Sequence, residues 1–124
     1  MKDKLSLAAA LLVAMGVQCS GYAAELVNGE VSDPLQADEY ELEDNATITY
    51  IGSGKGRDRL FEGKNNDQLI TGENINNISS DNQVFYVETK MNSPIVQTVN
   101  IKHINKITAE NSVFEVHGLS LIHI

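Results

Sequence analysis

Polar and apolar residues follow short-range patterns after residue 24, and these patterns predict strands. Residues 39–43 (EYELE) alternate apolar and acidic side chains, as expected for a strand with one buried face. The segment 46–52 (ATITYIG) is dense in β-branched and aromatic residues, which favour strands. Further strands are expected at 25–33 around an Asn28-Gly29 turn, 84–87, 96–102, 106–109 and 113–116. Helix is scarcely indicated.

Three consecutive nine-residue segments share one template. They are SGKGRDRLF (53–61), EGKNNDQLI (62–70) and TGENINNIS (71–79), with glycine second, Asp or Asn sixth and Leu or Ile eighth. A repeat this short cannot bury its apolar residue alone, so the copies are expected to stack. The pattern therefore predicts a solenoid.

The apolar position of this repeat extends beyond the three copies. Steps of nine residues land on aliphatic side chains at Leu42, Ile51, Leu60, Leu69, Ile78, Val87 and Val96. We predict that the first six form a ladder pointing into a continuous core. The expected fold of residues 25–118 is all-β, a short parallel β-helix or β-roll solenoid.

The first 24 residues have the order of a secretory signal peptide. A basic start (MKDK) precedes an apolar stretch at 5–17, and small residues at 21–24 provide a cleavage site after Ala23 or Ala24. A core helix, a membrane anchor and a lipoprotein modified at Cys19 are the alternatives, although Gln18 fits a lipidation box poorly. Cys19 is the only cysteine, so a cleaved chain would form no disulfide.

The charge balance disfavours nucleic acid as a partner. The whole chain has a formal net charge of −8, and removal of the signal peptide leaves it still more acidic. The densest acidic run, 38–44, is expected to be a solvated strand face, with attraction of cations as the alternative. The last six residues, 119–124 (LSLIHI), look like a translated sequencing adapter, which predicts a non-native tail and a longer natural protein.

The nonapeptides resemble the calcium-binding repeat of RTX proteins, G-G-x-G-x-D-x-U-x, in which U is a large aliphatic residue. The resemblance implies a β-roll with two repeats per coil and calcium held in the turns. It makes Asp58, Asp67 and Asn76 the candidate calcium ligands, with Asp58 above Asn76 and Asp67 facing Phe85 on the other side. The first glycine is replaced in every copy, so a metal-free solenoid is the competing expectation.

The chain as a whole resembles the start of an autotransporter-type surface adhesin of Gram-negative bacteria. The AELVNGEVS start, the ATITYIG segment and the isoleucine- and asparagine-rich stretch 100–118 carry this resemblance. It implies a β-helical passenger at the cell surface or outside the cell, a surface ligand or glycan as partner, and a downstream outer-membrane barrel. No transmembrane segment is expected in the mature fragment.

Catalysis is not expected from these residues. His103, His117 and His123 share no metal-ligand spacing, and the chain contains no nucleophile elbow, phosphate loop or H-E-x-x-H motif. Two alternatives to the adhesin remain open: a calcium-binding β-roll module, and the N-terminal part of a β-helix polysaccharide lyase.

Overall fold

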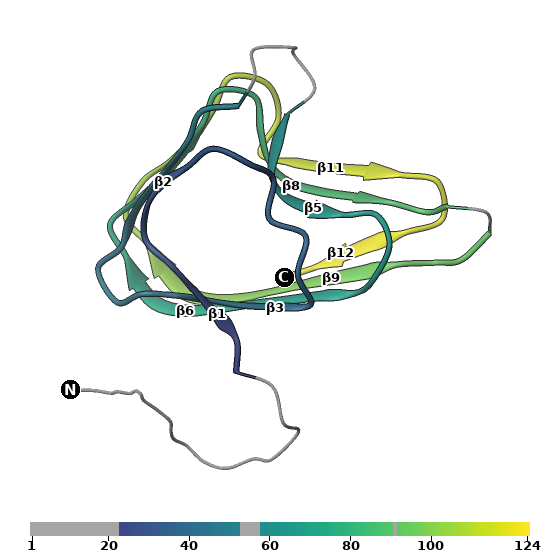
Figure 1. Ribbon diagram of the computed structural model, residues 1–124, viewed down its shortest axis with the longest axis horizontal. Helices are drawn as coiled ribbons and strands as arrows, with labels where there is room; N and C mark the ends of the chain where they lie inside the picture. The colour runs from purple at the N-terminus through teal and green to yellow at the C-terminus, as the bar shows by residue number, and fades with distance from the viewer. Residues whose placement is uncertain (1–22, 53–57, 91) are drawn as a thin grey trace.

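The computed structural model describes residues 23–52, 58–90 and 92–124, and every regular element in this part of the chain is a β-strand (Figure 1). The predicted all-β class is therefore confirmed. Among the described residues there is no helix long and apolar enough to cross a membrane. The expected signal peptide, including Cys19, falls almost entirely outside the described residues, as does the start of the first nonapeptide.

The strands form three parallel sheets, named A, B and C here. Sheet A contains β1 (Glu25–Val27), β3 (Glu39–Leu42), β6 (Gln68–Ile75), β9 (Val96–Ile104) and β12 (Leu121–His123). Sheet B contains β2 (Gly29–Val31), β4 (Thr47–Tyr50), β7 (Asn77–Ser80) and β10 (Ile107–Ala109). Sheet C contains β5 (Arg59–Gly63), β8 (Gln83–Glu88) and β11 (Phe114–His117).

The chain visits the sheets in a fixed order. From β4 onward it passes from sheet B to C to A three times, and Figure 1 shows these passages lying over one another around a ring. In these passages most paired residues are 29 or 30 positions apart, as with Ile48, Ile78 and Ile107. Partners in β5 and β8 are 24 apart, and partners in β9 and β12 are 25 apart. One full passage thus takes about three nonapeptides, each crossing one side.

This register corrects the expected stacking of the nonapeptides. Their three strands are β5, β6 and β7, and each belongs to a different sheet, so two repeats do not complete a coil. The backbone oxygen of Asp58 accepts a hydrogen bond from the Gln83 amide at 3.3 Å, which places Asp58 beside residues 82–83 and not above Asn76. Asp67 lies beside Val96, whose amide it binds, and does not face Phe85.

The predicted inward ladder is wrong at two of its six positions. Ile51 is 60% exposed and Leu69 is 38% exposed, whereas Leu42, Leu60, Ile78 and Val87 are buried. Ile51 lies just past the end of β4, and in β6 it is the next residue, Ile70, that points inward. In each sheet, side chains alternate between the inner and the outer face along the strand. The chain turns between sheets, so a residue nine positions further on can point to the opposite face.

Apolar side chains form three ladders, one from each sheet, and all of them are buried except the partly buried Ile107 and the 42% exposed Phe114. Tyr40, Ile70 and Val99 align in sheet A, and Ile48, Ile78 and Ile107 align in sheet B. In sheet C the rings of Phe61, Phe85 and Phe114 stack at centroid distances of 5.3 and 5.0 Å. These ladders provide the apolar core.

At both ends of the described chain the strands pair in parallel with strands from other passages. The turn at Asn28-Gly29, where Gly29 has φ 88°, does not form a hairpin, because β1 pairs with β3 and β2 pairs with β4. At the other end, β12 pairs with β9 in parallel, with Leu121 opposite Val96. Residues 119–124 thus contain a strand, and the adapter origin of this tail stays a prediction.

Candidate functional site

The structure places the three candidate calcium ligands at different corners. Asp58 precedes β5 in sheet C, Asp67 precedes β6 in sheet A, and Asn76 lies between β6 and β7. The Asp67 carboxylate accepts a hydrogen bond from the Val96 backbone amide at 2.9 Å. The Asn76 side-chain amide donates a hydrogen bond to the Thr47 hydroxyl at 2.8 Å. Within the described ranges, no group of three or more His, Cys, Asp or Glu could hold a metal ion. The nonapeptides therefore do not gather these residues into one ligand set.

A shallow groove of about 510 Å³ opens at the corner where strands of sheet A begin. It is lined by Asp38, Glu39, Asn66, Asp67, Gln68, Leu69, Val96 and Thr98. The side-chain amide of Asn66 donates to the Asp38 carboxylate at 2.5 Å, which fixes this carboxylate at the rim. Leu69 and Val96 add apolar surface. No Lys or Arg is present among the described residues that line the groove.

The groove continues into the outward face of sheet A. Glu39 and Glu41 point outward because the alternate residues, Tyr40 and Leu42, are buried. The partner of Glu39 in β6 is the half-exposed Leu69. We call the surface formed by Asp38, Glu39, Glu41, Asp67 and Leu69 the acidic face.

The sequence around the acidic face strengthens its negative field. Residues 25–52 carry eight acidic side chains and no Lys or Arg. Such a surface attracts basic groups and repels anions over about one Debye length, roughly 10 Å at 0.1 M salt. It can therefore select a partner by charge.

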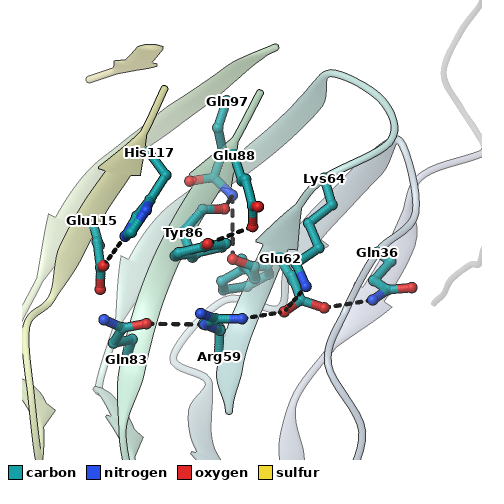
Figure 2. Close-up of polar contacts among 11 residues, drawn as sticks. Gln36, Arg59, Glu62, Lys64, Gln83, Tyr86, Glu88, Gln97, Glu115 and His117 are labelled. Atoms are coloured by element: carbon teal, nitrogen blue, oxygen red, sulfur yellow. Dashed lines mark hydrogen bonds and ion pairs between the residues drawn. The ribbon is translucent and has the colours of Figure 1, made fainter. Parts of the chain in front are cut away.

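A second polar cluster lies on sheet C (Figure 2). The buried Glu62 carboxylate accepts hydrogen bonds from Gln36 at 2.6 Å and from Arg59 at 3.0 Å, and Lys64 lies 3.7 Å away. Arg59 also donates to Gln83 at 3.1 Å. The positive charges of Arg59 and Lys64 offset the negative charge of Glu62, and the hydrogen bond from Gln36 holds the segment around Gln36 against sheet C. This arrangement favours a structural role for the cluster.

Tyr86 is the aromatic centre of this cluster. The Arg59 guanidinium lies 3.7 Å from the centroid of its ring, and the Tyr86 hydroxyl donates to Glu88 at 2.5 Å. Burial raises the pKa of Tyr86 to about 12, with the bond to Glu88 adding to the shift. The same bond lowers the pKa of Glu88. His117 packs beside the ring and bonds to Glu115.

The Tyr86 shift predicts loss of stability at alkaline pH. The unfolded chain releases the tyrosine proton near pH 10, whereas the folded chain holds it to about pH 12, so the free energy of unfolding should fall as pH rises between about 10 and 12. Urea unfolding across this range should show a smaller fall for Tyr86→Phe. A fall of the same size in both proteins would contradict this assignment.

Sequence reasoning missed the residues of the sheet C cluster, and it missed Gln97 of β9 in sheet A, which bonds to the backbone of sheet C. Gln97 is fully buried, and its side-chain amide donates to Gln68 at 2.7 Å and to the backbone oxygen of Phe61 at 3.4 Å. The signal for Gln97 was present, because it alternates with outward Val96 and Thr98 in a strand pattern. Arg59 and Glu62 gave no such signal, since their pairing depends on the path of the chain around the corner.

These contacts describe an acidic face on sheet A and a charge-compensated cluster on sheet C. Compared with known protein families, curated proteins and solved structures, the chain matches none of them.

Proposed function

We propose that the chain is a secreted, non-enzymatic parallel β-solenoid that forms the N-terminal part of an autotransporter-type surface adhesin. One observation carries this proposal: the chain passes through sheets B, C and A in a fixed order, with parallel partners 24 to 30 residues apart. Backbone hydrogen bonds between successive passages, together with the three side-chain ladders, give a scaffold that can be extended by further passages. The role is structural and adhesive.

The acidic face is the proposed adhesive surface, and its proposed partner is a basic segment of a surface protein. Carboxylates of Asp38, Glu39 and Asp67 surround apolar surface at Leu69, which suits a Lys or Arg side chain with its aliphatic stem. Outward Glu41 extends the same charge along β3. A glycan, the other ligand class considered for such adhesins, is an outcome that the test separates.

Charge reversal on β3 should remove binding of a basic probe. We expect a lysine-rich peptide to bind the protein with an affinity that falls with added salt, and Glu39→Lys combined with Glu41→Lys to weaken it at least about tenfold. Fluorescence anisotropy measures the affinity. Both side chains point outward, so the fold should be retained.

The matched control places the same kind of charge change elsewhere. Glu110→Lys combined with Glu115→Lys changes the net charge by the same amount at β11 and just before it, away from the acidic face, and should leave the affinity nearly unchanged. Equal loss in the control and in the β3 variant would show that only net charge matters and would reject the acidic face. Binding of a neutral glycan that both variants retain, without binding of the basic peptide, would reject the basic partner.

A further inference from the structure

Two asparagines of this chain occur in the acceptor triplet N-x-[ST] for N-linked glycans. The triplets are NAT at residues 45–47 and NIS at residues 77–79. Such a triplet also arises by chance, so the sequence alone does not identify a site. The structure separates the two asparagines, because their surroundings differ.

Asn45 lies on an exposed turn between β3 and β4. The backbone amide of Ala46 donates to the Glu43 carbonyl oxygen at 3.0 Å, which closes the turn. Asn45 has φ 62°, a conformation that asparagine tolerates. Ala46 is 1% exposed and anchors the turn to the core, whereas residues 43–45 are exposed. The Asn45 carboxamide donates a long hydrogen bond of 3.5 Å to Asp44, so it is open to an enzyme.

The third residue of this triplet, Thr47, also presents its side chain to solvent. It begins β4 and is exposed, whereas the next residue, Ile48, is fully buried. Its hydroxyl accepts a hydrogen bond from the exposed Asn76 side chain at 2.8 Å, and an enzyme can replace this surface contact. The acceptor triplet requires a hydroxyl at this position. The carboxamide and the hydroxyl are thus exposed on the same corner.

Asn77 is held inside sheet B. It begins β7, which lies between β4 and β10, and it pairs with Thr47 of β4. Its backbone amide donates to the Ala46 carbonyl oxygen at 3.2 Å, and its side-chain Oδ1 atom is buried. Modification of Asn77 therefore requires β7 to leave the sheet, which costs free energy that the exposed turn does not.

We propose that Asn45 is an N-glycosylation site whose donor is an oligosaccharide linked to a lipid through a diphosphate. In the transfer, the Asn45 Nδ2 atom attacks C1 of the first sugar, and a C1–N bond replaces the C1–O bond to the diphosphate. The lipid diphosphate leaves with the electron pair of the broken bond, Nδ2 loses a proton, and nothing is oxidised or reduced. Such transfer takes place outside the cytoplasm, so the site rests on the export that the proposed function includes.

Glycosylation of the purified, folded full chain tests the site without depending on export. The enzyme is an oligosaccharyltransferase that needs only the triplet, supplied with its lipid-linked donor, and mass spectrometry measures the occupied fraction of each asparagine. We expect Asn45 to be modified at least about tenfold faster than Asn77, since Asn77 reacts only after local opening. Short peptides of residues 43–49 and 75–81 are the sequence controls, and both should be modified.

Paired substitutions remove the hydroxyl of each triplet in turn. Thr47→Ala should abolish modification of the folded chain, Thr47→Ser should retain it, and Ser79→Ala, the matched control, should leave it unchanged. Asn45→Asp removes the acceptor and keeps a residue that tolerates positive φ. Circular dichroism of each variant shows whether the fold is retained.

An unmodified Asn45 in the folded chain would overturn the proposal, whether or not the peptide of residues 43–49 is modified. Equal modification of Asn45 and Asn77 would overturn it as well. Expression in cells that carry the same enzyme outside the cytoplasm tests export separately. A chain that is modified when purified but not in cells would reject export, and with it the proposed function, while Asn45 remains an acceptor.

Discussion

Replacing Ile70 with Asp is expected to unfold the protein or to lower its free energy of unfolding by at least about 3–5 kcal/mol, the usual effect of an uncompensated buried charge. Ile70 is fully buried in the centre of sheet A, between Tyr40 and Val99. A carboxylate at this position would have no partner in the apolar ladder. Chemical unfolding followed by circular dichroism measures the loss.

The neighbouring position gives a matched control for this substitution. Leu69 differs from Ile70 by one step along β6 and points outward, so Leu69→Asp should change the free energy of unfolding by no more than about 1 kcal/mol. The sequence repeat predicts the opposite, because it places Leu69 in the core ladder. Unfolding by Leu69→Asp with tolerance of Ile70→Asp would therefore reject the observed alternation of β6 and restore the ladder.

Local patterns in the sequence predicted most strand positions. The alternation at 39–43 corresponds to β3, the β-branched segment at 46–52 contains β4, and the segment 113–116 overlaps β11. These predictions succeed because alternation within a strand is fixed by local geometry and by one buried face. The aliphatic eighth positions of the three nonapeptides, Leu60, Leu69 and Ile78, lie in β5, β6 and β7.

The arrangement of the strands could not be derived in the same way. A nine-residue spacing is compatible with two repeats per coil or with three, and the choice depends on how the chain turns at each corner. The glycine- and asparagine-rich residues between the strands allow either path. For this reason Asp58 and Asp67 were expected on opposite sides of a two-sided roll, whereas they lie at two corners of a three-sided ring.

The candidate sites depend on contacts between passages, which a linear pattern does not contain. Gln36 and Glu62 meet at 2.6 Å although they are 26 positions apart in the sequence. The acidic face was partly visible in the run 38–44, but its groove also requires Asp67 and Val96 from later passages.

Replacing Phe85 with Ala is expected to lower the free energy of unfolding by about 3–5 kcal/mol, the range for buried phenylalanine. Phe85 is the middle ring of the sheet C stack, so the change leaves a cavity and removes contacts with both Phe61 and Phe114. The loss should exceed that from burial alone, because each stacked pair adds about 0.5–1.5 kcal/mol. Urea unfolding at neutral pH measures it.

Phe114→Ala provides the comparison that separates a continuous ladder from separate contacts. Phe114 is the last ring of the stack and is 42% exposed, so its removal should cost only about 1 kcal/mol. In a continuous ladder the middle ring supports both neighbours, and the double variant should then lose less than the two single losses combined, since both variants remove the same stacked pair. Strict additivity, or a larger loss at Phe114 than at Phe85, would show that the rings do not act as one ladder. Because β11 pairs with β8 alone in sheet C, this comparison also measures how strongly β11 is held to the rest of the protein.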